Sequence, residues 1–593
     1  MDSNILSFLM KDELTIFFSV LIVLILLPVF IYSKGYVGEY KTHYSTKYFW
    51  TLMVLFAASM LGVVLSSNSI SFLVFWELMS LFSFFLIIYE YRNKRNIKIG
   101  IMYFVMTHIS GLLLICMFIL LQKYTGSIDF HVLAISALKL TYSQKSVIIL
   151  LALLGFGAKA GLLPVHAWLP KAHPAAPSNI SALMSGVMLK IALYGFIRVA
   201  FQFLDGVSPV YAGLVMLFGV ITAVYSVINA LLQDDIKKLL AYSSAENIGI
   251  IFCTLGLSMM FNSYKLYGLG VLALTAALFH ILNHAAFKSL LFTGAGSVLY
   301  ATSTKDMNML GGLYKKMKFV TWCMLIGTAA ISAIPPLNGF ASEMLILRSF
   351  VEGTAAFKNS LLIVAIVACG TLLAFTSGGV IWSAVKCFGI TFLGEPRTEK
   401  AIQTRKIPMS MNVGMGILAS YTIVLGVFSP FIIKIISGVA ANLTGQAVGL
   451  QSNGFGYEIT LVSVLIIVVS VALYGWVKLV SKNKTSETHE TWGCGFDYPK
   501  PFMQYSSGGF SQPMAKFSGD VAGYKKEVKI KDKVYLKQKV HDVIEKNVYV
   551  NIVKGINYCS EKIAKIHYGK VQIYVAYIFI SLVLALALVM NFV

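Results

Sequence analysis

The chain has 593 residues, of which 57% are hydrophobic and only 12% are charged. Soluble proteins are usually about 45–50% apolar and about 25% charged, so this composition excludes a water-soluble globule. The net charge of +22 suggests nucleic-acid binding, but the basic residues lie in short loops and one late segment rather than on one folded face. The sequence therefore predicts an all-α polytopic membrane protein.

The cysteines argue against metal and redox chemistry in this chain. No two of them share a CxxC spacing, whereas structural zinc and iron–sulfur clusters need clustered thiolates. No Walker A loop or GxGxxG fingerprint follows a strand pattern, so the sequence gives no support to ATP-driven pumping or nicotinamide chemistry. We therefore expect no metal and no cofactor here. The cysteines are Cys116, Cys253, Cys323, Cys369, Cys387, Cys494 and Cys559.

About fourteen apolar blocks have roughly the twenty residues that cross a bilayer. The first follows several charged residues and no small-residue cleavage site, so we interpret it as a retained helix and not a signal peptide. The expected spans are 14–32, 47–66, 70–89, 100–121, 147–170, 176–200, 208–231, 239–260, 268–293, 319–350, 359–392, 413–437, 456–480 and 571–592.

Lysine and arginine in short loops predict the orientation, because such loops stay in the cytoplasm. The pattern puts both termini outside an inner (cytoplasmic) membrane. The loop 122–146, with three lysines on the outside, is the main exception. The loops predicted to be cytoplasmic are 33–46, 90–99, 232–238, 294–318 and 393–412.

The segment 481–570 is then cytoplasmic and Lys-rich, and 571–593 is a final transmembrane anchor. Apolar residues recur every four positions late in the segment, which predicts an amphipathic lateral helix along the membrane or along neighbouring subunits. An ordinary solvated linker helix is the alternative. The apolar residues are Val540, Ile544, Val548, Ile552 and Ile556.

Several ionisable residues fall within the apolar spans. A charge at bilayer depth costs at least about 2.5–3.5 kcal/mol, so each is a candidate functional residue. The main candidates for a proton or ion relay are Glu77, Lys159, Lys190, His280, His284, Lys288 and Glu343. Two further candidates are weaker, Glu246 and Lys386; for each, the alternative is a position near a helix end with a role in packing alone.

Prolines interrupt two of the predicted spans. Pro164 follows Lys159 closely, and Pro335-Pro336 precedes Glu343 by a few residues. Proline removes a helical hydrogen bond, and irregular backbone at membrane depth is tolerated only beside a cavity or inside protein. Two interrupted helices indicate a transporter built from two inverted repeats, each with a broken helix.

Simpler interpretations exist for each group. Glu77 could belong to a static ion pair, Lys159 could snorkel from a helix end, and Lys190 could be a structural counter-charge. His280 and His284 have the spacing of a metal pair, but no third ligand is evident.

The predicted organisation follows from the spans and the breaks. It comprises N-terminal helices (1–66), a first half-channel (67–231), a second half-channel (232–393), C-terminal helices (394–480), the tail (481–570) and the anchor (571–593).

Three motifs resemble the antiporter-like subunits shared by respiratory complex I, multisubunit cation/proton antiporters and membrane-bound hydrogenases. The resemblance covers roughly residues 50–440. The motifs are Phe75-Trp76-Glu77-Leu78-Met79, the run from Leu163 to His173 (LPVHAWLPKAH), and the run from Asp234 to Ser243 (DDIKKLLAYS).

Two further motifs resemble the hydrogenase branch, that of formate hydrogenlyase subunit 3 and hydrogenase-4 component B. One is Ala245-Glu246-Asn247-Ile248-Gly249, where complex I subunits tend to have histidine at the glutamate. The other is the tail with Trp492-Gly493-Cys494-Gly495-Phe496, Met503-Gln504-Tyr505 and Phe510-Ser511-Gln512-Pro513. The sequence departs from typical relatives in having fewer helices before Glu77.

The resemblance implies roles for the candidates. Glu77 and Lys159 correspond to the Glu/Lys pair of the first half-channel, and Lys190 to the bridging lysine. His280, His284 and Lys288 correspond to the central axis, and Glu343 to the acid or base of the second half.

The resemblance also implies partners: other membrane subunits and a peripheral arm with a nickel–iron centre and iron–sulfur clusters. The rival functions are a subunit of a multisubunit Na⁺(K⁺)/H⁺ antiporter, a subunit of a complex I-like quinone oxidoreductase, and a structural anchor for a peripheral arm. The sequence leaves open whether H⁺ or Na⁺ moves.

Overall fold

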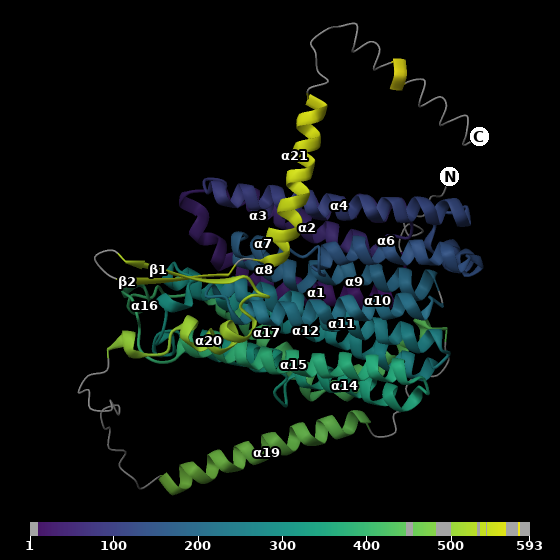
Figure 1. The fold of residues 1–593 in the computed structure, drawn as a ribbon. Coiled ribbons are helices and arrows are strands. Elements are labelled where there is room, and N and C mark those ends of the chain that lie inside the picture. Colours follow the sequence, from purple (N-terminus) through teal and green to yellow (C-terminus); the bar gives the residue numbers. More distant parts are fainter. Residues whose placement is uncertain are drawn as a thin grey trace. The chain divides into compact units, whose positions relative to one another are not determined.

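A computed structural model describes residues 10–204, 206–445, 455–481, 500–530, 534–540, 542–564 and 579–581. Within these residues, twelve helices are long and apolar enough to cross a membrane. The long helices between residues 13 and 427 lie side by side in one bundle (Figure 1). This confirms the all-α polytopic fold. The predicted anchor 571–593 lies almost wholly outside the described residues.

The first part of the bundle runs to the end of α10. Its membrane helices begin at polar caps: the side chains of Asp12, Asn68 and Thr141 accept backbone N–H groups at the starts of α1, α3 and α6. The helices are α1 (Glu13–Tyr36), α2 (Thr46–Leu65), α3 (Ser69–Ile87), α4 (Lys94–Thr125), α5 (Phe130–Ser136), α6 (Tyr142–Ala160), α7 (Leu169–Ala175), α8 (Ser178–Leu183), α9 (Leu189–Ile197) and α10 (Pro209–Leu231).

The second part contains the other long helices and a four-residue helix. Asp235 caps α11 by accepting the backbone N–H groups of Lys237 and Lys238. The helices are α11 (Ile236–Ser263), α12 (Tyr267–Thr302), α13 (Lys318–Ile331), α14 (Asn338–Ala356), α15 (Ser360–Phe392), α16 (Glu399–Ile402), α17 (Met409–Val427), α18 (Ser429–Leu443) and α19 (Phe455–Ser481).

Both predicted breaks are present. Residues 161–168 separate α6 from α7, and 332–337 separate α13 from α14. The predicted span 147–170 is therefore too long for one helix, and 319–350 is two helices. The span 413–437 also divides, because α17 ends at Val427 and α18 begins at Ser429. The count of about fourteen and the inverted repeats stay predictions.

Two π-helical turns, η4 (Met184–Met188) and η5 (Arg198–Phe203), flank α9. A π-turn widens the helix and is frequent at functional sites. Here η4 directly precedes Lys190 in the chain.

The tail contains structure that the sequence analysis did not predict. Helix α20 (Ser507–Ser518) packs on α10 and α15, with Ser507, Ser511 and Ser518 buried. Strands β1 (Tyr524–Ile530) and β2 (Val534–Val540) form an antiparallel hairpin in which Val528 faces Leu536. The alternation of apolar and charged residues there is the strand signal that the analysis missed.

Residues from 541 onwards form a separate unit. It contains a π-helical turn, η9 (Glu545–Tyr549), and α21 (Val550–Ala564). Apolar Ile552, Ile556 and Ile563 line a shallow groove on one face of α21, as expected of an amphipathic helix. Val540, predicted to start this helix, instead ends β2.

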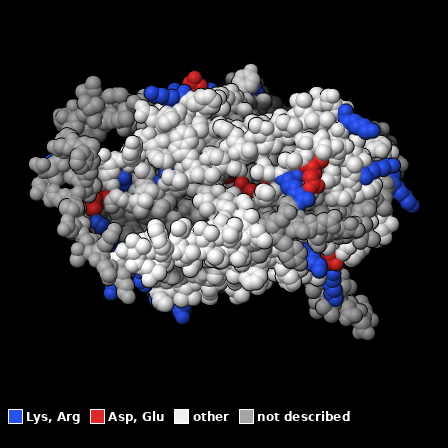
Figure 2. Space-filling model, turned by 90° about the horizontal axis from the view of Figure 1, so that it is seen from below, with Lys and Arg blue, Asp and Glu red and all other residues white. Residues whose placement is uncertain are grey.

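The surface supports a membrane location. In Figure 2 most of the visible side chains are uncharged, and the lysines and arginines lie in small groups. Many large apolar side chains are exposed along α4 and α15, including Ile109, Leu112, Val364 and Val385. Such a surface suits hydrocarbon or partner helices rather than water.

Candidate ion-translocation site

Glu77 lies mid-way along α3 and faces α4. Its Oε2 is 3.1 Å from Nδ1 of His108, an ion-pair distance without the alignment of a hydrogen bond. Gly111, one turn after His108, makes room for the carboxylate, because a Cβ there would lie 1.9 Å from Glu77 Oε1. The Glu77 side chain is 32% exposed and that of His108 is 49% exposed, so the pair reaches the surface of the chain.

Lys159 is fully buried near the end of α6. Its ammonium group donates to Ser80 Oγ at 2.7 Å and to Tyr103 Oη at 3.1 Å, and lies 5.9 Å from the Trp76 ring centroid. Ser80 lies one turn after Glu77 on α3. Glu77 and Lys159 therefore share a site, but the lysine bonds to hydroxyl groups and senses the carboxylate through space.

The first break is stabilised by polar contacts. Gly161 ends α6 with a φ of +87°, a conformation that favours glycine. Trp168 Nε1 donates to the freed carbonyl of Ala158 at 2.8 Å, and Leu163 N–H donates to Thr222 Oγ1 at 3.0 Å. These bonds replace helical ones inside the protein.

Lys190, also fully buried, lies near the start of α9. Its ammonium group donates to the carbonyl oxygen of Ser185, which lies in the π-helical turn η4. Ser185 Oγ is 2.8 Å from Ser244 Oγ on α11, and this contact joins η4 to α11. Lys190 lies within electrostatic range of Lys288.

His280, His284 and Lys288 lie on one buried face of α12. His280 contacts Asn247 Oδ1 at 3.1 Å and Ser342 Oγ at 3.0 Å. Both ring nitrogens of His284 are buried and have no hydrogen-bond partner among the residues that the structure describes. The Lys288 ammonium group donates to Ser243 Oγ at 2.5 Å and to the carbonyl of Leu240 at 3.2 Å.

Two carboxylates lie beside this face. Glu246, fully buried on α11, accepts a hydrogen bond from Asn247 Nδ2 and lies within electrostatic range of Lys288 and Glu343. Glu343 on α14 follows Ser342, the contact of His280, and accepts from Ser377 Oγ at 2.8 Å. His280 therefore contacts the chain neighbour of each acid: Asn247 follows Glu246, and Ser342 precedes Glu343.

Lys386 lies apart from these contacts, near the end of α15. It is fully buried and bonds to the end of α10 and to α20. The remaining groups form three clusters, around Lys159, around Lys190 and around Lys288. The lysines of the three clusters bond to different partners.

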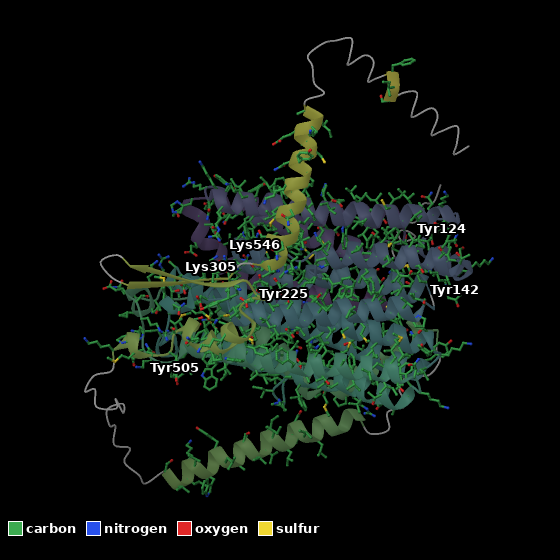
Figure 3. All side chains as sticks on the ribbon, viewed as in Figure 1. Tyr124, Tyr142, Tyr225, Lys305, Tyr505 and Lys546 are labelled. Carbon is green, nitrogen blue, oxygen red and sulfur yellow. The ribbon has the colours of Figure 1, made fainter. Side chains whose placement is uncertain are left out.

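A cavity of about 770 Å³, here called the vestibule, opens where loops from distant parts of the sequence meet. Its charged lining includes Glu39, Glu90, Asp234, Asp235, Asp306, Lys237 and Lys305. Lys305, labelled in Figure 3, pairs with Asp235 at 3.2 Å. Burial raises the pKa of Asp306, as do the nearby carboxylates of Asp234 and Asp235, whereas hydrogen bonds from Asn308 lower it.

The opposite end of the bundle holds a bidentate ion pair. Arg198, only 1% exposed, donates to Asp12 Oδ2 at 2.8 Å and Oδ1 at 3.0 Å. Burial alone would raise the pKa of Asp12, but the charge of Arg198 and hydrogen bonds from Arg198 and Thr15 lower it to about 2.

The sequence analysis missed His108, Tyr103, Asp234 and the Asp12–Arg198 pair. His108 and Arg198 are ionisable groups in apolar runs and could have been found by the rule that identified Lys159. Asp234 belongs to one of the family motifs, but the sequence contains no separate indication of a role for it. Among the described residues, no group of three or more His, Cys, Asp or Glu could hold a metal ion.

Comparison with known families assigns the chain to a class. Residues 66–373 match the family described as NADH:quinone oxidoreductase/Mrp antiporter, transmembrane. The chain belongs to this family and is an antiporter-like subunit that spans the membrane.

Curated relatives give a finer comparison. Hydrogenase-4 component B of Escherichia coli (strain K12) is 37% identical over 521 residues, which are 85% of this chain and 76% of the relative. Formate hydrogenlyase subunit 3 of the same organism is 34% identical over 465 residues, 78% of this chain and 73% of the relative.

A solved structure, that of the membrane-bound sulfane sulfur reductase, an archaeal respiratory membrane complex, contains a chain with the same fold. The TM-score is 0.76 at 22% identity, and the match covers 98% of this chain and 89% of that one.

Proposed function

We propose that this chain is the ion-translocating subunit of a membrane-bound nickel–iron hydrogenase complex of the formate hydrogenlyase type. Protons, or alternatively Na⁺, pass through the buried groups of its two halves. The driving force comes from redox reactions in partner subunits that hold a nickel–iron centre and iron–sulfur clusters. The identity with hydrogenase-4 component B across most of the chain supports this choice of complex.

One observation carries the proposal: Lys159, Lys190 and Lys288 are fully buried, and each ammonium group is hydrogen-bonded. Each costs at least about 2.5–3.5 kcal/mol at membrane depth, which a purely structural span would avoid. Their partners are neutral hydroxyl and carbonyl groups, so no bonded carboxylate fixes the charge. A proton held in this way can leave when a nearby charge changes.

The relay runs along the bundle from one edge to the other. Glu77, near the surface at one edge, holds the proton on Lys159 while its carboxylate is charged and close. When the Glu77 carboxylate is neutralised or moves away, Lys159 releases its proton toward Lys190. Lys288, His284 and His280 then carry charge to Glu343. Glu246 supplies a further carboxylate beside Lys288.

We assign the vestibule end of the bundle to the cytoplasm. Four of the loops whose lysines and arginines predict a cytoplasmic location line this one cavity, which supports the assignment. We further propose that the half-channels are 67–231 and 232–393 and that 481–570 is cytoplasmic.

The test is ion uptake by inverted vesicles during hydrogen evolution. Lys159→Met and Glu343→Gln are each expected to lose most of the uptake per hydrogen evolved, because they remove a group that holds the moving charge. Two variants are the matched controls. Lys139→Met changes an exposed lysine in a short 3-10 turn, and Glu352→Gln changes a glutamate on the same helix as Glu343.

Uptake equal to the native value in both relay variants would contradict the relay. Cation exchange driven by an imposed pH gradient, without hydrogen evolution, would instead identify a subunit of a multisubunit Na⁺(K⁺)/H⁺ antiporter.

A further inference from the structure

Lys386 is the buried amine that the relay described above does not use. Its ammonium group donates to the carbonyls of Leu231 and Gln233, each at 2.7 Å, and to Ser511 Oγ at 2.7 Å. Leu231 ends α10, where carbonyls lack helical partners and carry partial negative charge. All three N–H donors of this lysine therefore have partners.

The surroundings of Lys386 point in two directions. Toward the centre of the bundle, Cys387 lies within electrostatic range of both Lys386 and Lys288. Toward the surface, Lys386 lies within range of Asp234, which lines the vestibule. Lys386 thus lies between the central lysine of the relay and a wide polar opening.

Helix α20 covers this position. Ser507 Oγ donates to Asp234 Oδ1 at 2.7 Å, and Ser511, one turn later, contacts both Lys386 and the Leu231 carbonyl, the latter at 2.6 Å. Ser507 therefore contacts Asp234, and Ser511 contacts Lys386.

The segment before α20 is fixed as well. Gln504 bonds to the backbone N–H and carbonyl of Glu395, and Arg397 donates to the carbonyl of Tyr505, which is labelled in Figure 3. Residues 504–511, here called the latch, are thus attached to the loop after α15 as well as to α10.

We propose that Asp234, Lys386 and Lys288 form a side branch that connects the vestibule to the relay, and that the latch closes it. This rests on the proposed function, because the branch delivers ions to that relay. When the latch is released, Asp234 is freed from Ser507 and Lys386 loses one of its three partners. Lys386 can then exchange its proton with water in the vestibule.

Packing alone does not account for this arrangement. With an apolar residue at position 386, the Leu231 carbonyl would keep its hydrogen bond from Ser511, so packing does not require a lysine for that carbonyl. Burial of an amine is costly, and here one of its three hydrogen bonds comes from a hydroxyl in a segment more than a hundred residues away in the chain. That dependence makes the state of Lys386 sensitive to the latch.

The first test uses Cys387 as a reporter in the intact complex. A membrane-impermeant maleimide is added to inverted vesicles, and alkylation of Cys387, which is 1% exposed, is followed by mass spectrometry. Ser507→Ala/Ser511→Ala is expected to react at least about tenfold faster, the shift that loss of two hydrogen bonds gives to an opening equilibrium. Ser518→Ala is the control and stays at the native rate, because the Ser518 hydroxyl donates to the carbonyl of Met514 on the same helix.

The second test measures ion uptake per hydrogen evolved. Lys386→Met is expected to lose uptake, Lys386→Arg to retain much of it, and Lys434→Met, exposed on α18, to match the native complex. Assembly of each variant complex is checked by size-exclusion chromatography. If Lys386→Met does not assemble, the Cys387 measurement decides the proposal.

Native uptake in Lys386→Met, or native labelling in the double alanine variant, overturns the branch. If Lys159→Met loses uptake while Lys386→Met does not, only the branch is wrong. If both retain native uptake, the proposed function itself fails.

Discussion

Glu77 and His108 differ from the central residues of the relay because they lie partly at the surface of the chain. Lys159, Lys190 and Lys288 are enclosed by the chain's own helices, so their environment is complete within one subunit. Glu77 has its carboxylate at the edge, held beside His108 by the absence of a side chain at Gly111. In the proposed relay, the absence of a Cβ at Gly111 therefore fixes where the Glu77 carboxylate can lie.

Gly111→Ala tests this point. The added Cβ would lie 1.9 Å from Glu77 Oε1, so the carboxylate must move away. We expect uptake per hydrogen evolved to fall as it does in Glu77→Gln, with assembly retained, because glycine to alanine alone favours a helix by about 1 kcal/mol. Gly389→Ala, which meets no atom within 4 Å, is the matched control. Native uptake in Gly111→Ala would contradict the assigned position of Glu77.

The Asp12–Arg198 pair predicts a definite pH dependence. The folded-state pKa of Asp12, about 2, lies below its ordinary value of 3.8, so its contribution to stability is complete above about pH 4 and is lost as the pH falls through about 2. Asp12→Ala leaves the buried guanidinium without its carboxylate, a change that costs about 3–5 kcal/mol.

The measurement is the thermal midpoint of the solubilised complex. The difference between native and Asp12→Ala protein should stay constant between about pH 5 and 8 and shrink at lower pH. A difference that changes across neutral pH would contradict the pairing.

Among the helices, the two broken ones were predictable and the latch was not. The prolines and the polar residues near them are local signals, and the structure has a break at each site. The latch depends on contacts such as Ser507–Asp234, between residues that no periodicity relates. The hairpin β1–β2 carried a local signal, but the lysine-rich composition around it suggested a solvated tail.

The second break also depends on a distant glycine. A Cβ at Gly426 on α17 would lie 2.3 Å from the Pro336 carbonyl oxygen and 2.7 Å from Asn338 N, both backbone atoms. Gly426→Ala is therefore expected to destabilise the complex by about 1–3 kcal/mol and to lower uptake by displacing α14, which carries Glu343. Thermal midpoint and uptake are the measurements, and Gly438→Ala, in open space on α18, is the control. An unchanged midpoint would mean that α17 does not support the break.

Among the described residues up to 540, buried ionisable groups lie inside the bundle and many apolar side chains are exposed on its outer surface. Sequence alone predicted the membrane class, most helices and the nine ionisable candidates. It did not predict how they group, because hydrogen bonds such as Lys159–Tyr103 and Ser185–Ser244 join helices far apart in the chain. Hydropathy identifies helices, but the rotation of each helix about its axis is set by its neighbours.

At this scale the exposed edge near Glu77 predicts a neighbour. Ile109, beside His108, is 53% exposed in the isolated chain. A photo-crosslinking amino acid at position 109 is expected to join this chain to another membrane subunit in the assembled complex. Adducts with lipid alone would show that the relay ends at this edge and is not continued by a partner.

The incomplete burial of Glu77 and His108 has a consequence for biogenesis. Before assembly, this edge exposes a carboxylate–imidazole pair to lipid, at a cost of at least a few kcal/mol. A chain that has not assembled with its neighbour therefore differs from an assembled one by this exposed polar pair, which a membrane protease or chaperone would recognise. Cells that lack the neighbouring subunit should accordingly degrade this chain rapidly, and Glu77→Gln should lengthen its lifetime there.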